Sequence, residues 1–132
     1  MKTITSIKGI IATCTLSLVL LLTACSKSDP DVQPTLTTTA ATSITSNGAV
    51  LGGNVTSAGN QGIQNLGVVI GTSADPVLTA NLTVFATGNS TGPFTCPPVT
   101  TLAPNTLYHA RAFAQTNTGI AYGNDITFTT LP

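Results

Sequence analysis

The chain has 132 residues, of which 6% are charged, and its four Lys and Arg residues balance its four Asp and Glu residues. Nucleic-acid binding requires a basic patch that neutralises phosphates, so this composition argues against that class of function. A soluble helical bundle needs many Lys, Glu and Arg residues, so the composition argues equally against an all-α fold.

The first 24 residues have the layout of a signal peptide. Lys2 and Lys8 precede an apolar run that extends from Gly9 to Leu22. This run is shorter than the roughly 20 apolar residues that a membrane-spanning helix needs. The pattern therefore predicts a secretory signal peptide over residues 1–24.

The run ends in Leu22-Thr23-Ala24-Cys25, which resembles the lipobox of bacterial lipoproteins. The resemblance implies cleavage before Cys25, diacylglycerol on its thiol and an acyl chain, such as palmitate, on the freed amino group. Each buried methylene contributes about 0.8 kcal/mol, so several acyl chains would hold the protein at a membrane. The alternative is a buried helix that ends at an ordinary cysteine.

The residue after the cysteine is Ser26 and not Asp, which resembles the sorting pattern of outer-membrane lipoproteins in Gram-negative bacteria. The expected location is therefore the outer membrane of the cell envelope. Whether the chain faces the periplasm or the cell surface stays open.

Residues 25–36 are expected to form the lipidated cysteine and a flexible tether, because they are polar and include Pro30 and Pro34. Cys14 would be lost with the signal peptide, and Cys25 would carry lipid. Cys96 then has no partner for an intramolecular disulfide, although pairing between two chains stays open.

Residues 37–132 consist of short β-rich runs separated by Gly, Asn, Asp and Pro. The runs expected to form strands are 37–42, 49–55, 66–71, 82–86, 92–96, 107–115 and 126–130. About seven strands at this spacing predict an all-β sandwich without helices. Pro97 and Pro98 follow the fifth run, and since proline lacks an N–H donor they predict a bulge or an edge strand there.

The run 107–115 alternates between two kinds of residue, so one set should face the core and the other the solvent. The residues expected inside are Tyr108, Ala110, Ala112 and Ala114, and those expected outside are His109, Arg111 and Phe113. The segment 102–108 matches a tyrosine corner, in which a tyrosine hydroxyl bonds to backbone a few residues upstream. Structural roles are therefore expected for Tyr108, Leu102 and Pro104.

Four segments together resemble the fibronectin type III-like (immunoglobulin-like) repeats of bacterial envelope lipoproteins. They are GAVLGGNV, LGVVIGTSADP, TGPFT and LAPNTLYHARAFAQTNTGIAYGNDITFTT. The resemblance covers about residues 37–131 and implies a single seven-stranded sandwich domain over residues 37–132. The sequence departs from the pattern at the two prolines after the fifth run, and it contains no Trp.

Few side chains beyond residue 25 could support chemistry: one His, one further Cys, four Asp and no Glu. A metal site needs several such ligands together, so neither a metal nor a cofactor is expected. Cys96 and His109 are the only available nucleophilic pair, but we expect Cys96 in the core and His109 on the surface. Arg111 and Asp125 lie on neighbouring predicted strands and are expected to pair across the sheet.

These observations favour a lipid-anchored, non-catalytic envelope module that contacts a protein or a glycan in adhesion or as an accessory subunit. The alternatives are a structural spacer or self-assembling envelope subunit and, more weakly, a small hydrolase that uses Cys96 and His109. The expected partners are the membrane, through Cys25, and an unknown envelope protein or glycan. The candidate binding face consists of His109, Arg111, Phe113 and Tyr122.

Overall fold

The computed structural model describes residues 29–132, so the expected signal peptide and Cys25 lie outside the described residues. Residues 31–132 form one compact unit. Strands in two sheets make up its regular structure, and residues 29–132 contain no helix. The predicted all-β sandwich is confirmed.

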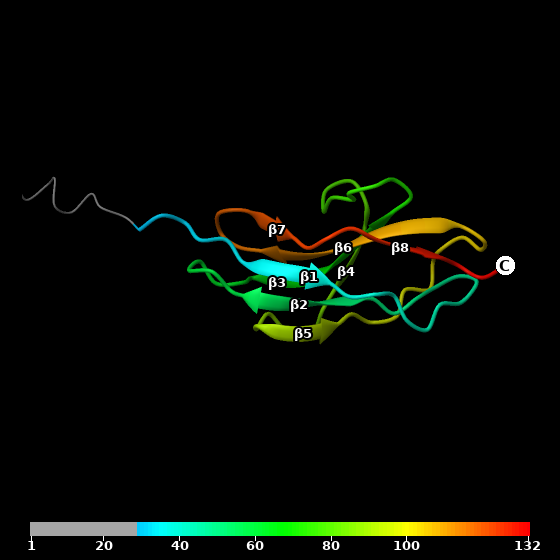
Figure 1. Ribbon diagram of the computed structural model, residues 1–132, viewed down its shortest axis with the longest axis horizontal. Helices are drawn as coiled ribbons and strands as arrows, with labels where there is room; N and C mark the ends of the chain where they lie inside the picture. The colour runs from blue at the N-terminus through cyan, green and yellow to red at the C-terminus, as the bar shows by residue number, and fades with distance from the viewer. Residues whose placement is uncertain (1–28) are drawn as a thin grey trace, which may run out of the picture. The chain divides into compact units, whose positions relative to one another are not determined.

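The smaller sheet has three antiparallel strands in the order β1-β2-β5 (Figure 1). Their bounds are β1 Thr35–Thr38, β2 Gly52–Ser57 and β5 Gly92–Thr95. The strand β5 lies at an edge and ends just before Pro97 and Pro98, as the two prolines predicted.

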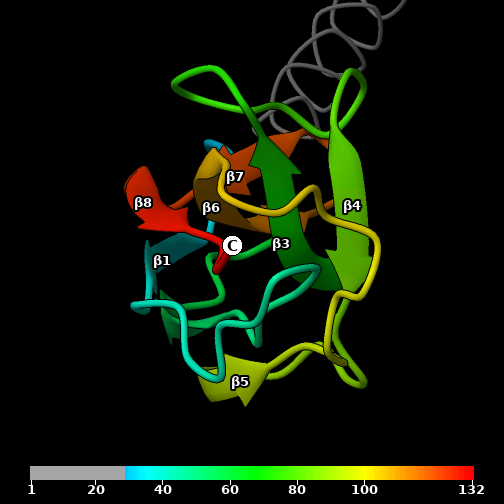
Figure 2. The same cartoon turned by 90° about the vertical axis from the view of Figure 1, so that its right-hand side faces the viewer.

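The larger sheet has the order β4-β3-β6, and both β7 and β8 pair with β6 on its other side. Its strands are β3 Asn65–Gly71, β4 Leu82–Phe85, β6 Leu107–Gln115, β7 Ile120–Tyr122 and β8 Ile126–Thr129. Figure 2 shows the two layers end-on, with β5 and β7 on opposite sides of the unit.

Eight strands are present between residues 29 and 132 where seven were expected, because residues 120–122, which precede the last expected run of 126–130, form an additional strand, β7. Thr38 of β1 contacts the segment between β7 and β8. Its backbone N–H donates to Asn124 Oδ1 at 2.9 Å, and its hydroxyl donates to the Asn124 carbonyl at 2.6 Å. The same hydroxyl accepts a hydrogen bond from Ala112 N at 2.9 Å. The end of β1 therefore joins the two sheets.

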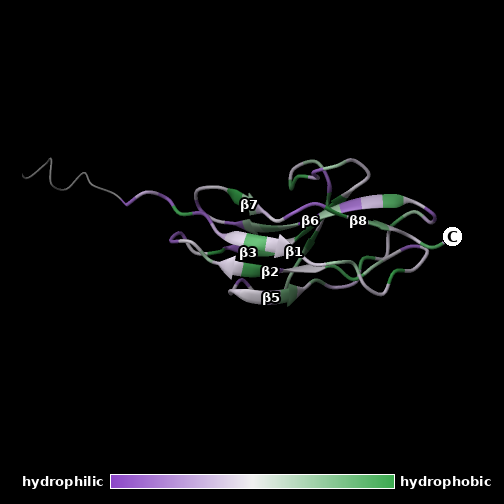
Figure 3. Cartoon of the chain, in the orientation of Figure 1, coloured by the Kyte–Doolittle hydropathy of each residue, from purple (hydrophilic) through white to green (hydrophobic). Residues whose placement is uncertain are grey.

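The core lies between the sheets. The inward alternation predicted for β6 holds for Ala110, Ala112 and Ala114, which are fully buried. These small side chains let the opposite sheet approach closely. A Cβ added to Gly53 of β2 would come within 2.8 Å of the Ala112 Cβ, so the backbones of β2 and β6 can pack this tightly only with glycine there. Strongly hydrophilic residues lie mostly in the connections (Figure 3).

The segment before β6 has the contact that a tyrosine corner requires. Tyr108 Oη accepts a hydrogen bond from Ala103 N at 2.9 Å, and the Tyr108 ring stacks on Phe128 with centroids 5.8 Å apart. Leu102 is buried, and the Pro104 carbonyl accepts a hydrogen bond from the Thr106 hydroxyl at 2.9 Å.

The first strand begins at Thr35, two residues before its expected start. Ahead of it, Val32 N donates to Asn60 Oδ1 at 2.9 Å and the Val32 carbonyl accepts from Asn60 N at 3.1 Å. Residues close to β1 that were expected in the tether therefore pack on the sandwich.

Candidate binding site

The outer face of the larger sheet carries a row of aromatic residues. The strand register places Phe85 of β4 opposite Gly67 of β3, Gly67 opposite Phe113 of β6, and Phe113 opposite Tyr122 of β7. These four positions alternate with residues that face the core, so they share the side of the sheet that points away from it. The predicted binding residues His109, Arg111, Phe113 and Tyr122 lie on this face. The face has two halves, one around His109 and Arg111 and the other around Phe85.

Phe113 is fully buried, whereas it was expected to be exposed. The cause is the register. Gly67 has no side chain, and a Cβ at that position would lie 2.9 Å from the Phe113 ring, so the ring fits directly over Gly67. The Phe85 ring then meets it edge-on at 85°, with centroids 5.8 Å apart. A side chain that faces away from the core is thus covered by its neighbours.

The half of the face around His109 and Arg111 is covered by the β3–β4 loop (residues 72–81), which lies above β6 in Figure 1. Leu78 N donates to Tyr122 Oη at 3.0 Å, and Asp75 N donates to Asp125 Oδ2 at 3.1 Å. Val69 shows the effect of this cover, because it lies on the outward side of β3 and yet is fully buried. The predicted binding face is therefore largely closed by the chain itself.

The side-chain contacts of Arg111 and Asp125 beneath this loop differ from the expected pair of Arg111 with Asp125. Asp125 Oδ2 lies 2.8 Å from His109 Nδ1. Arg111 instead lies 3.9 Å from Asp75 Oδ1, donates from Nε to the Gly123 carbonyl at 3.2 Å, and sits 4.4 Å from the centre of the Tyr122 ring. Asp125 directly precedes β8, in which Ile126 pairs with Ala110, and its carboxylate reaches the neighbouring His109 of β6. These side chains hold the loop in place.

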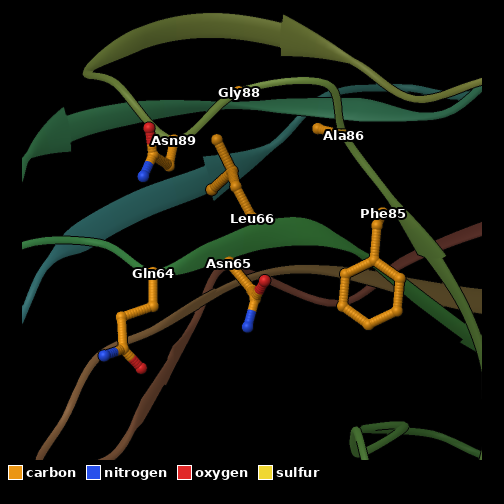
Figure 4. Close-up of a pocket in the computed structure, with 7 residues that line it drawn as sticks. All are labelled: Gln64, Asn65, Leu66, Phe85, Ala86, Gly88 and Asn89. Carbon is orange, nitrogen blue, oxygen red and sulfur yellow. The ribbon is translucent and has the colours of Figure 1, made fainter.

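The other half of the face is open and contains a pocket of about 370 Å³, here called the Phe85 pocket. Phe85 borders this pocket and is 52% exposed. The pocket is also lined by Gln64, Asn65, Leu66, Ala86, Gly88 and Asn89. Figure 4 shows the Phe85 ring and the amides of Gln64 and Asn65 on one side of β3, while Leu66 points to the other.

The amides of the Phe85 pocket are held by hydrogen bonds to the protein. Asn65 Nδ2 donates to Gln115 Oε1 at 3.0 Å, and Asn89 Nδ2 donates to the Ile63 carbonyl at 2.8 Å. Gln64 Nε2 donates to Asn117 Oδ1. Each amide thus donates one N–H to the protein and retains a second N–H and a carbonyl oxygen for other partners.

Phe85 was not among the predicted site residues, although the sequence held a signal for it. In the run Leu82-Thr83-Val84-Phe85-Ala86, Val84 and Ala86 pack against the core. Period-two alternation then places Thr83 and Phe85 outside, by the same count that was applied to β6. The amides around Phe85 come from β3 and from the connections before β3 and after β4, and no sequence spacing brings these together.

Cys96 and His109 do not form a nucleophilic pair. Cys96 is 3% exposed and belongs to the core between the sheets, while His109 lies on the outer face of β6. Burial raises the pKa of the Cys96 thiol to about 11, despite a backbone hydrogen bond that lowers it. The thiol is therefore protonated at neutral pH and is a poor nucleophile.

Within residues 29–132, no three His, Cys, Asp or Glu side chains come together as metal ligands. The same stretch contains no helix with the length and hydropathy needed to cross a membrane.

No protein-family model matches the chain, and no curated protein matches it. Solved structures do. Two structures of the sensor domain of the anti-sigma factor RsgI4 in Pseudobacteroides cellulosolvens are similar to it at 16% identity. The short form has a TM-score of 0.56 over 74% of this chain and 94% of that domain, and the solution structure has 0.57 over 75% and 76%. The fibronectin type III domain of human KIAA0970 protein has a TM-score of 0.49 at 18% identity, over 73% and 72%. At these identities the likeness concerns the fold alone.

Proposed function

We propose that the mature chain is a non-catalytic contact module, anchored to the cell envelope by lipid on Cys25. The signal-peptide layout of residues 1–24 and the lipobox-like ending support the anchor. The sandwich fold, and its likeness to a domain described as a sensor, support a binding role over a catalytic one.

The observation that carries the contact function is the open Phe85 pocket. It combines a half-exposed aromatic ring with amides that hydrogen bonds to the protein orient. Aromatic residues at an open polar site are typical of recognition surfaces. The thiol that a hydrolase would use is buried in the core instead.

The anchor is tested by expressing the full chain in a Gram-negative host. We expect mass spectrometry to find an N-terminal peptide that begins at Cys25 and carries acyl chains, and fractionation to place the chain in the outer membrane. The Cys25→Ser variant should lose the acyl chains and leave the outer-membrane fraction. Cys96→Ser is the matched control and should keep both properties. A secreted chain with an unmodified Cys25 would contradict the anchor.

The contact function is tested by screening the purified full chain, in non-ionic detergent, against envelope proteins and glycans from the same cells. We expect saturable binding to one of these classes, with at least a tenfold loss in Phe85→Ala. Absence of binding to either class would contradict the contact function.

A structural spacer or self-assembling subunit is the competing function. The edge strands β1, β4, β5, β7 and β8 have only three or four residues each, and β5 contains Pro93. Short edges and proline both limit strand addition by another chain. Size-exclusion chromatography separates the two functions, since a contact module should be monomeric and a self-assembling subunit should form higher oligomers.

A further inference from the structure

We infer that the Phe85 pocket binds an uncharged carbohydrate chain, with a sugar ring on Phe85 and its hydroxyls on the neighbouring amides. This inference rests on the proposed contact function and names the chemical class of its ligand. Three features of the site lead to it: a fixed aromatic ring, amides with unused hydrogen-bonding capacity, and the absence of charge.

The Phe85 ring is a supported surface for a ligand. Its edge contact with Phe113, which itself lies over Gly67, fixes the ring against the sheet. Sugar rings have C–H faces that are apolar although their rims carry hydroxyls. A half-exposed ring can cover such a face while the rim remains within reach of polar groups.

The amides provide the polar groups. Gln64, Asn65 and Asn89 are oriented by the hydrogen bonds that they donate to the protein. Their carbonyl oxygens accept no hydrogen bond from residues 29–132, and each retains one N–H. A hydroxyl both donates and accepts, so a group with a free donor and a free acceptor matches it. Because the amides are already held, binding costs little side-chain entropy.

The charge distribution excludes the main competing ligands. No Asp, Arg or His lines the Phe85 pocket. Arg111 is the only Lys or Arg among residues 29–132, and it lies under the β3–β4 loop against Tyr122 and Asp75. An anionic ligand would find no counter-charge at the pocket. A peptide anchor prefers a desolvated apolar pocket, whereas this one is open and bordered by amides.

A second hollow of about 180 Å³ extends the polar surface across the connection from β4 to β5 (residues 86–91). It shares Leu66, Ala86 and Gly88 with the Phe85 pocket, and its lining adds the hydroxyls of Thr87, Ser90 and Thr91. It also lacks charged residues. The two hollows together suit an extended, hydroxyl-rich chain better than a single small molecule.

The test is affinity electrophoresis of the full chain, in non-ionic detergent, through gels that contain one polysaccharide each. The neutral probes are dextran, laminarin and galactomannan, and the anionic probes are alginate and polygalacturonate. We expect retardation by at least one neutral polysaccharide and none by the anionic ones. Phe85→Ala should weaken binding at least tenfold, and Asn65→Ala about threefold to tenfold.

Two further variants keep the test decisive. Leu82→Ala removes a 43% exposed apolar side chain from the same strand outside the pocket, and should bind like the wild type. Phe85→Leu retains apolar volume without an aromatic face, and should lose most of the binding while circular dichroism shows an unchanged fold.

Retardation by none of the neutral probes, retardation by anionic probes only, or binding that Phe85→Ala leaves intact would overturn the inference. Co-sedimentation of the same chain with envelope proteins, measured in parallel, distinguishes failure of carbohydrate binding from failure of the contact function. Protein binding without polysaccharide binding overturns the carbohydrate inference and leaves the contact function standing. Failure in both assays overturns both.

Discussion

The two halves of the outer face of the larger sheet lie on the same strands but differ in whether the chain covers them. Around His109 and Arg111 the β3–β4 loop covers the strands, and even the outward Val69 is buried. Around Phe85 the same sheet is open, and the aromatic row ends in a half-exposed ring. The difference shows that strand alternation assigns a side chain to a face, whereas the connections decide whether that face is free to bind.

The buried and exposed aromatic residues of the same row offer the strongest test of this comparison. Phe113→Ala should lower the free energy of unfolding by about 3–5 kcal/mol, because it leaves a cavity over Gly67. Phe85→Ala removes a half-exposed ring and its edge contact, and should cost only about 1 kcal/mol. Urea unfolding of both variants measures the difference. Equal losses would show that the two rings are not in different environments.

A substitution at Gly67 tests whether the aromatic row depends on the close approach of Phe113 and the β4 backbone to this glycine. A Cβ at this position would lie 2.3 Å from the Val84 carbonyl oxygen as well as against the Phe113 ring. Gly67→Ala should therefore destabilise the sandwich by about 2–3 kcal/mol, since the backbone of β4 must move. Gly119→Ala is the matched control, because its nearest neighbour is the end of the Gln33 side chain at 3.9 Å, and it should cost less than about 1 kcal/mol. The same denaturation assay measures both variants, and a Gly67→Ala variant as stable as the control would contradict the close packing of Val84 and Phe113 on Gly67.

The core lies beneath both halves of the outer face, so it should exclude solvent under the open half as well as under the covered half. Burial raises the pKa of Cys96 from 9.0 to about 11. The unfolded chain then loses this proton at lower pH than the folded chain, so this contribution to stability is fully present below pH 9 and is lost as the pH rises through 11. We expect a loss of about 2 kcal/mol across that window in urea unfolding.

Cys96→Ala should remove this part of the pH dependence while the rest remains. Native alkylation with iodoacetamide at pH 8 should also be slow for Cys96. Rapid alkylation in the folded protein would show that the core near β5 opens to solvent.

The sequence-based predictions succeeded where a feature depends on neighbouring residues in the chain. The alternation in β6 placed Ala110 and Ala112 inside, and the spacing from Ala103 to Tyr108 gave the corner contact. Phe113 was misassigned because its burial depends on a glycine in β3 and a ring in β4, which only the strand register brings together. The cover over Arg111 depends on a loop whose path no local pattern fixes. The Phe85 pocket likewise joins a ring of β4 and an amide of β3 to amides from two separate connections.

The smallest expected effect concerns the attachment of the loop itself. Tyr122→Phe removes the hydroxyl that accepts a hydrogen bond from Leu78 N, and should weaken the closed state by about 1 kcal/mol. Hydrogen exchange should then become about fivefold faster at the Leu78 amide, with little change in the core strands. Tyr108→Phe removes an equivalent bond to Ala103 N in the corner, so it should accelerate exchange at Ala103 and leave Leu78 unchanged. If Tyr122→Phe left exchange at Leu78 as slow as in the wild type, other contacts would hold the loop. If it altered binding at the Phe85 pocket, the two halves of the face would be coupled and could not be treated as separate surfaces.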